Sequence, residues 1–285
     1  MLTKEQLHAK IAAGVRFLDG ATGSNLQKAG MPAGCCTEEW VINHPEALVS
    51  LQRAYARAGS QILYAPTFQA QPIALEKVGL AARTEAVNAA LVALSRSAAP
   101  DCLIAGDLTT LAAFLETWDP DNYDDMVANY RRQIRGLIDG GADLLIGETL
   151  LYAVEAEAIL EAAELEGAGA VMLSFTMQSD GCLFSGRDAA PVLRELEAAG
   201  AAAVGFNCVA AGPELPGLVQ KLRRHVRGPL ICKPNAGLPV QTPEGMVYPM
   251  SPEEFAEIMA QCAENGATLL GGCCGTAPEY IAALR

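Results

Sequence analysis

Three cysteines are spaced so that their thiolates could meet on one metal ion. Cys273 and Cys274 are adjacent, follow an apolar run and are bracketed by glycines that allow the backbone to turn. Neighbouring side chains of an extended strand point to opposite faces, so such a turn is needed for both sulfurs to address one point. Cys208 ends another short apolar run. Three cysteine ligands with a free fourth position are typical of a reactive zinc site rather than a closed structural one.

The remaining cysteines give weaker signals. A free cysteine is more often a small buried hydrophobe than a reactive group, so we interpret four of them as core or neutral positions: Cys102, Cys182, Cys232 and Cys262. Cys35 and Cys36 form a second adjacent pair, but they lie in a predicted loop without strand support. The role of this second pair stays open.

The elements that must position the three cysteines follow a repeated pattern of a short apolar run and then a helix. The predicted strands are 15–19, 62–65, 102–106, 143–147, 170–175, 202–206, 229–233 and 267–270. The predicted helices are 47–58, 84–98, 123–139, 153–166, 189–199, 215–226, 252–264 and one from Pro278. The strands are nearly continuous apolar runs, which indicates burial of both faces. Most of the helices end at a glycine, the residue suited to a left-handed cap.

Eight such units in 285 residues predict an α/β fold of the (β/α)8 TIM-barrel type, as a single domain over 1–285. A doubly wound open sheet is the competing architecture, but no G-x-G-x-x-G turn opens a predicted helix. Active sites of such barrels lie at the carboxyl ends of the strands. We therefore expect the zinc site at those ends.

Polar residues follow several of the predicted strands: Asp19, Gly20, Thr67, Asp107, Glu148, Asn207 and Asn235. The acids among them would face the cysteines across the barrel mouth. A metal–thiolate centre opposite carboxylates suits a small ligand with a thiol at one end and an amine at the other, such as an amino-acid thiol. Asp19 and Glu148 could instead cap helices or pair with arginine. Lys233 lies inside a predicted strand, and we expect it to pair with a carboxylate in a structural role.

Composition excludes several classes of function. The net charge of −13 argues against binding to nucleic acid or anionic membranes, which requires a basic surface. There is no apolar run of about 20 residues that could span a membrane, and the first residues lack a signal-peptide pattern. Nine cysteines without a secretory signal fit reduced thiols, so we expect a cytoplasmic protein.

Five segments together resemble the homocysteine S-methyltransferase family over nearly the whole chain. They are Phe17-Leu18-Asp19-Gly20-Ala21-Thr22-Gly23, Gly147-Glu148-Thr149, Gly205-Phe206-Asn207-Cys208, Pro234-Asn235-Ala236-Gly237-Leu238-Pro239 and Gly271-Gly272-Cys273-Cys274-Gly275. The resemblance implies a (β/α)8 barrel that holds zinc through Cys208, Cys273 and Cys274. It also implies that Asp19, Gly20 and Glu148 bind the amino-acid part of homocysteine, and that Asn235 lies beside the metal and contributes to substrate binding.

The methyl donor is less constrained by this resemblance. The Pro-Asn-Ala-Gly-Leu-Pro run is similar to the homocysteine module of cobalamin-dependent methionine synthase, and Gln69 stands where betaine-using members carry tyrosine. Pro66 and Thr109-Thr110 depart from the family pattern at the barrel mouth. We expect zinc-dependent methylation of homocysteine to methionine from a methyl-corrinoid protein, with methylcobalamin on that separate protein because no corrinoid domain is expected here. The alternatives are an S-methylmethionine donor or another thiol acceptor.

Two other classes of function fit these residues less well. A non-catalytic protein that binds a metal or a corrinoid partner would not need three cysteines together with Glu148. A thiol redox protein would have to use Cys273 and Cys274, but adjacent cysteines form a strained ring and the chain has no C-x-x-C motif. Methyl transfer is the function that uses all of these residues.

Overall fold

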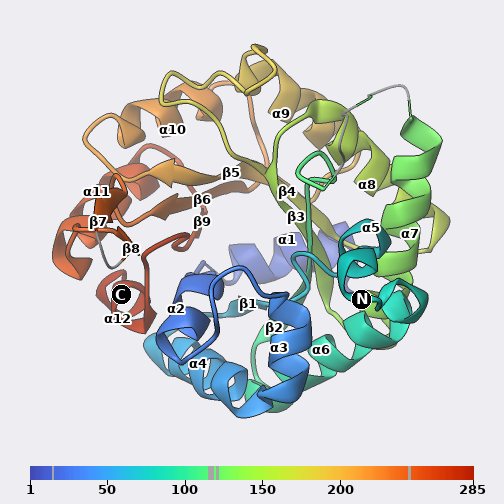
Figure 1. Ribbon diagram of the computed structural model, residues 1–285. Helices are drawn as coiled ribbons and strands as arrows, with labels where there is room; N and C mark the ends of the chain where they lie inside the picture. Colours follow the sequence, from blue (N-terminus) through green and yellow to red (C-terminus); the bar gives the residue numbers. More distant parts are fainter. Residues whose placement is uncertain (15, 115–118, 120–121, 243–244) are drawn as a thin grey trace.

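The computed structural model describes residues 1–285 except 15, 115–118, 120–121 and 243–244. A curled parallel sheet lies at the centre and is surrounded by helices (Figure 1). Its seven strands run in sequence order around the sheet: β1 (Ile62–Tyr64), β2 (Leu103–Thr109), β3 (Leu144–Leu150), β4 (Val171–Phe175), β5 (Ala203–Ala210), β6 (Leu230–Asn235) and β9 (Leu269–Leu270). Each strand pairs in parallel with the next, as in a TIM-type barrel.

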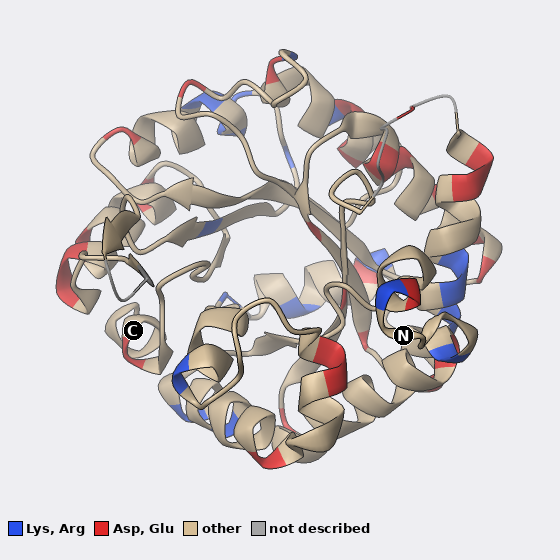
Figure 2. Ribbon diagram, viewed as in Figure 1, with Lys and Arg blue, Asp and Glu red and all other residues tan. Residues whose placement is uncertain are grey.

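The helices that follow the strands pack on the outer face of the sheet. They are α4 (Pro45–Ala58), α6 (Thr84–Ala98), α7 (Tyr123–Asp139), α8 (Ala153–Leu165), α9 (Ala189–Ala198), α10 (Leu215–Arg223), α11 (Pro252–Glu264) and α12 (Pro278–Ala283). Figure 2 shows Asp and Glu positions on helices all round the ring, in keeping with the net charge. The α/β class and the repeated strand–helix pattern are confirmed.

Shorter elements fill the connections. They are α1 (Lys4–Ala12), α2 (Gly23–Lys28), α3 (Thr37–Asn43), α5 (Pro72–Leu75), the 3-10 turns η1 (Glu76–Val78) and η2 (Ala81–Arg83), and a hairpin of β7 (Val240–Thr242) and β8 (Gly245–Val247). The sequence patterns did not predict α2, α3 or the hairpin. The hairpin is antiparallel and separate from the main sheet.

The prediction of a first strand over 15–19 is wrong. Among the described residues the main sheet has seven strands, and this segment contributes only a single parallel bridge, from Phe17 to Leu270. Val15 lies outside the described residues. The Leu18 N–H donates to Leu270 O at 2.8 Å, and the Gln61 N–H donates to Phe17 O at 2.8 Å. The segment is therefore hydrogen-bonded to both edges of the curled sheet. At the end of this segment the buried side chain of Asp19 accepts a hydrogen bond from the N–H of Tyr64 at 2.8 Å.

The interior of the curled sheet is filled by side chains from alternate strand positions, among them Ile62, Leu144, Ile146, Met172 and Leu269. Leu7 of α1 packs against the same cluster. The backbone of Leu2 donates to Asp143 O and accepts from Ala170 N, at the starts of β3 and β4. The segment before and including α1 thus covers the amino ends of the strands and leaves the carboxyl ends free for a site.

No helix within the described part of the chain is both long and apolar enough to cross a membrane.

Candidate metal centre and substrate cavity

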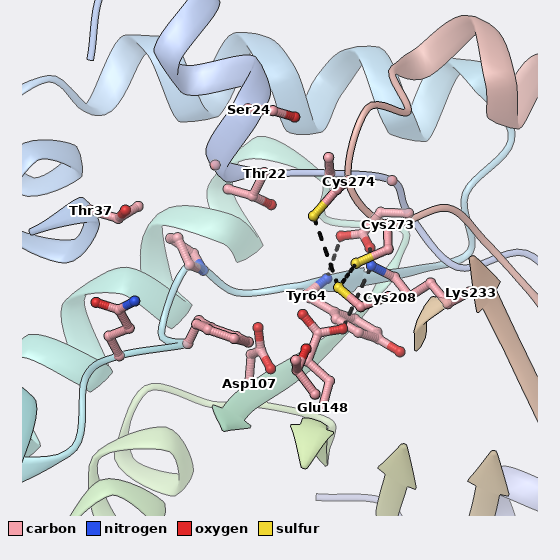
Figure 3. A pocket seen from close by; sticks show the side chains of 18 of the residues that line it. Thr22, Ser24, Thr37, Tyr64, Asp107, Glu148, Cys208, Lys233, Cys273 and Cys274 are labelled. Atoms are coloured by element: carbon pink, nitrogen blue, oxygen red, sulfur yellow. Dashed lines mark hydrogen bonds and ion pairs between the residues drawn. The ribbon is translucent and has the colours of Figure 1, made fainter. Parts of the chain in front are cut away.

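The three predicted cysteines converge at the carboxyl ends of the strands (Figure 3). Cys208 Sγ lies 2.8 Å from Cys273 Sγ and 3.9 Å from Cys274 Sγ. All three sulfurs lie within 4.8 Å of one another. Hydrogen bonds from Cys208 and Cys273 lower the pKa of Cys274, while the same cluster raises the pKa of Cys208. The group can therefore offer thiolate ligands to a soft metal ion.

A bulge in the backbone turns Cys208 toward the other two cysteines. The register of β5 against β6 shifts between Asn207 and Ala210, and Cys208 itself has a φ of 56°. Thr149 has a φ of 57° at the matching shift in β3. Left-handed conformations are costly for residues other than glycine and persist where the surroundings fix them, often at functional sites.

Glycines allow the turn that carries the adjacent cysteines. A Cβ on Gly272 would collide with the side chain of Thr276, and Gly275 has a φ of +82°. The Thr276 hydroxyl donates to Cys273 O at 2.7 Å and accepts from the N–H of Ala21 at 3.1 Å. The cysteine turn is thereby fixed to the loop that follows Asp19.

Asn235 connects the two cysteine segments. Its Nδ2 donates to Cys208 O at 3.1 Å, and its Oδ1 accepts from the N–H of Cys274 at 3.0 Å. The contribution of Asn235 to substrate binding stays a prediction, and Asn235 is not among the described residues that line the cavity. Its place is between the segments that carry the sulfurs, where it sets their separation.

Asn207, next to Cys208, has a similar connecting role that the sequence did not reveal. Its Oδ1 accepts from the N–H of Thr149 at 2.8 Å and from the hydroxyl of Ser174 at 2.9 Å. Its Nδ2 lies 3.8 Å from Cys273 Sγ. Asn207 therefore ties the bulge of β3 to the sulfur cluster.

A cavity of about 300 Å³ lies beside the sulfurs. The residues predicted to bind the amino-acid part of a substrate, Asp19, Gly20 and Glu148, all line it, together with Asp107. The other walls come from α2, α3 and the connections beside them, which contribute Thr22, Ser24, Thr37, Glu38, Phe68 and Gln69. Thiolates and carboxylates thus share one cavity.

The carboxylates of this cavity are buried and incompletely hydrogen-bonded. Asp19 Oδ1, Asp107 Oδ1 and Glu148 Oε2 have no hydrogen-bond partner. Burial raises the pKa of Asp19 to about 6 and that of Glu148 to about 7, although the charge of Lys233 opposes both shifts. Burial and the neighbouring Glu148 raise the pKa of Asp107. Three buried carboxylate oxygens that accept no hydrogen bond can receive the cationic group of a ligand, and two of them also lie within ion-pair distance of Lys233.

Lys233 lies among these acids. Its Nζ is 3.5 Å from Asp19 Oδ1, 3.7 Å from Glu148 Oε2 and 4.6 Å from the centre of the Tyr64 ring. Burial lowers the pKa of Lys233, but the charges of Glu148 and Asp19 outweigh it and hold this pKa well above its usual range. The predicted pairing with a carboxylate is confirmed. The sequence did not indicate that Lys233 also lines the cavity.

Glu38 is a second cavity residue that sequence reasoning missed. It is fully buried, its Oε1 accepts from the N–H of Gln69 at 2.7 Å, and Cys36 Sγ approaches its Oε2 at 3.4 Å. Burial raises the pKa of Glu38. Glu38 lies in the first turn of α3 and not at a strand end, so its position depends on how α3 packs over the cavity.

A wider groove of about 960 Å³ lies on the other side of Cys208. Its lining is largely apolar and includes Phe184, Leu238 and Val240, which are 60%, 73% and 50% exposed. Three carboxylates, Glu214, Glu254 and Glu257, complete the lining. Met246 and Val247 of β8 extend the exposed apolar surface. Cys208 therefore borders both the closed cavity and an open groove.

The family model for homocysteine S-methyltransferase matches residues 16–285, and the chain belongs to this family. The resemblance inferred from the sequence is thereby confirmed.

Curated relatives support this membership. The chain is 29% identical to the methionine synthase of Mycobacterium leprae over 95% of its own length, and 29% identical to that of Mycobacterium tuberculosis over 92%. It spans about a quarter, 24%, of the length of each of these relatives.

Solved structures of similar length also match. The metallated form of the homocysteine methyltransferase MmuM from Escherichia coli aligns with a TM-score of 0.81 and 28% identity, covering 98% of both chains. Its oxidized form aligns with a TM-score of 0.78 and 28% identity, covering 95% of this chain and 94% of that one. The carboxyl transferase domain of Rhizobium etli pyruvate carboxylase, at 15% identity and a TM-score of 0.57 over 99% of this chain and 49% of that one, shares the fold alone.

Proposed function

We propose that this chain is a zinc-dependent methyltransferase that activates homocysteine as a thiolate and methylates it to methionine. The observation that carries the proposal is the placing of three cysteine sulfurs, within 4.8 Å of one another, at the wall of a cavity with three carboxylate oxygens that accept no hydrogen bond. A ligand with a thiol at one end and an ammonium at the other would satisfy both groups. Homocysteine, the substrate named by the family, has this form.

The residues present fit a zinc ion. Soft thiolate ligands favour zinc over magnesium or calcium. Tetrahedral Zn–S bonds of about 2.3 Å separate two sulfurs by about 3.8 Å. The Cys208–Cys274 separation of 3.9 Å matches this value, whereas the Cys208–Cys273 separation of 2.8 Å would have to widen when the ion binds. A relative in this family has been solved in a metallated form. Cys208, Cys273 and Cys274 would hold the ion and leave its fourth position toward the cavity.

Zinc in that position would supply a Lewis acid that favours the thiolate form of a substrate sulfur. The residues of the chain would do the rest. Glu148, Asp19 and Asp107 would accept hydrogen bonds from the substrate ammonium. Gly20 would line the place of the amino-acid part, and glycine is required there because a Cβ would collide with Tyr55 and Thr276. Fixing both ends of the substrate orients its sulfur for attack on a methyl group.

We propose that the methyl group arrives through the open groove that borders Cys208, carried by methylcobalamin on a separate corrinoid protein. Two observations support a protein-borne donor. Exposed apolar side chains such as Leu238 and Val247 gather at this rim, and large exposed apolar patches are typical of protein-binding surfaces. The curated relatives are methionine synthases about four times as long as the matched segment, so more chain accompanies it there.

A second candidate donor is a small sulfonium such as S-methylmethionine. Glu254 and Glu257 line the groove, and their charge favours a cation. The remaining alternative, methyl transfer to another thiol, would leave the ammonium-binding carboxylates without a purpose.

We further propose that 1–285 acts as one homocysteine-binding domain in the reducing cytoplasm, because all nine cysteines are free.

The proposal is tested by replacing each ligand cysteine. Cys208→Ala and Cys273→Ala proteins should lose most of their zinc and their homocysteine methylation while the fold remains. Cys182→Ala is the matched control, since Cys182 lies away from the cluster on the loop before α9 and should keep about one zinc per chain. Metal analysis and a methylation assay are the measurements. Full zinc content in Cys208→Ala would contradict the assignment.

A further inference from the structure

Lys233 is the one basic side chain among the described residues that line the substrate cavity (Figure 3). It projects from β6 and is only 4% exposed. Lysine is rarely buried to this degree unless it is paired. The walls around it are otherwise acidic, with Asp19, Asp107 and Glu148.

The ion pairs of Lys233 are longer than others in the same molecule. Its Nζ lies 3.5 Å from Asp19 and 3.7 Å from Glu148. By contrast, surface arginines reach their carboxylates at 2.6 Å in Arg131–Glu166 and 2.7 Å in Arg132–Glu85. Charge-assisted hydrogen bonds are about 2.7–2.9 Å long. Lys233 is therefore not fully coordinated, and the acid oxygens that face it also lack hydrogen-bond partners.

A ligand that carries both signs of charge would complete this arrangement. An ammonium could donate hydrogen bonds to Asp19 Oδ1, Asp107 Oδ1 and Glu148 Oε2, none of which accepts one, and it would share the first and last of these oxygens with Lys233. If that ammonium belongs to a free amino acid, a carboxylate enters the cavity with it. A buried carboxylate without a partner is costly, so it needs a cation nearby. Among the described lining residues that cation is Lys233.

We propose that Lys233 binds the carboxylate of the acceptor amino acid and is a specificity-determining residue of this site. The inference rests on the proposed function and deepens it, since it restricts the acceptor to thiols that are free amino acids. The Tyr64 ring covers one side of the lysine ammonium, with its centre 4.6 Å away, and the two acids lie on other sides. The contrary role for Lys233 is that of a counter-charge which only keeps Asp19 and Glu148 in place.

Three thiols of similar length separate these roles. Homocysteine has both charged groups, 3-aminopropane-1-thiol lacks the carboxylate, and 4-mercaptobutanoate lacks the ammonium. Calorimetry would measure their binding to the zinc-loaded wild type and to its Lys233→Met and Lys233→Arg variants. Loss of a charge-assisted hydrogen bond should weaken binding about tenfold to a hundredfold. We expect that loss in Lys233→Met for homocysteine and 4-mercaptobutanoate, no change for 3-aminopropane-1-thiol, and substantial recovery in Lys233→Arg.

The outcomes separate this inference from the proposed function. If Lys233→Met weakens 3-aminopropane-1-thiol as much as homocysteine, or weakens none of the thiols, the carboxylate role is overturned. If the variants fail to fold, the affinities of the wild type still test the inference. The wild type should bind homocysteine at least about tenfold more tightly than 3-aminopropane-1-thiol. Equal affinity for these two thiols overturns the inference while leaving thiol methylation intact. A wild type that takes up zinc but binds no thiol would contradict the proposed function itself.

Discussion

Asn235 Oδ1 accepts a hydrogen bond from the backbone N–H of Cys274 at 3.0 Å. The same side chain donates to the carbonyl of Cys208, so one amide joins the ends of β5 and β9 across β6. The separation of the cysteines therefore depends on a side chain that the structure places outside the cavity lining.

Replacing Asn235 by alanine should weaken zinc binding without unfolding the protein. Two neutral hydrogen bonds are lost, worth about 1 kcal/mol each, which corresponds to roughly a thirtyfold loss of affinity. Competition with a chelator would measure it. Asn265→Ala is the control, because Asn265 caps α11 at the surface away from the cysteines. Unchanged zinc affinity in Asn235→Ala would show that the cysteine segments hold their positions without it.

Replacing Glu148 by glutamine should weaken homocysteine binding and leave the zinc content unchanged. A charge-assisted hydrogen bond in a desolvated cavity contributes about 1.5–3 kcal/mol, so the dissociation constant should rise by one to two orders of magnitude. Calorimetry with homocysteine, alongside metal analysis, is the measurement. An unaltered dissociation constant would return Glu148 to a purely structural role.

The Glu148→Gln substitution should also stabilise the metal-free fold at high pH. The pKa of Glu148 is raised to about 7 and that of Asp19 to about 6 in the folded protein, chiefly by burial. A carboxyl with a raised pKa stabilises the fold below its unfolded-state pKa, and this contribution is lost as the pH rises through the folded-state value. The free energy of unfolding of Glu148→Gln should therefore exceed that of the wild type at pH 8 but not at pH 4. Urea unfolding at both values tests this, and an equal difference at both would contradict it.

The donor proposal predicts a strong dependence on how the methyl group is presented. Free methylcobalamin should methylate homocysteine slowly, and a methylated corrinoid protein much faster, because docking supplies proximity. Val247→Asp should slow the second reaction and leave the first unchanged, since Val247 is 46% exposed on β8 beyond the residues that line the groove. Efficient turnover with S-methylmethionine alone would favour the sulfonium donor instead.

Much of the fold could be predicted because its signals are local. The helices 84–98, 123–139 and 252–264 have the bounds that were predicted, since their apolar spacing and end residues act within the helix itself. The convergence of Cys208 with Cys273 and Cys274 was also predictable, because the ends of parallel strands meet at one edge of the sheet.

Other features depend on contacts between distant segments and could not be predicted. Glu38 reaches the cavity through the fold of a loop, and the left-handed conformations of Thr149 and Cys208 arise from bulges set by neighbouring strands. The β7–β8 hairpin was missed because its apolar residues are few and largely exposed. Lys233 lay in a predicted strand, but only the curvature of the sheet shows that its side chain faces the cavity.

The bridge between Phe17 and Leu270 fastens the first segment of the sheet to the last. Asp19 follows that bridge by two residues on one side, and Cys273 follows it by three on the other. The site thus depends on a joint between distant parts of the chain. Among the described residues, backbone hydrogen bonds donated by the N–H groups of Leu18, Leu270 and Gly272 hold this joint. A local opening of this joint would separate the acid from the thiolate and abolish activity before the remaining strands came apart. Bound metal and substrate would stabilise this joint against local opening. Amide hydrogen exchange in residues 16–20 and 268–276 should therefore slow when they bind.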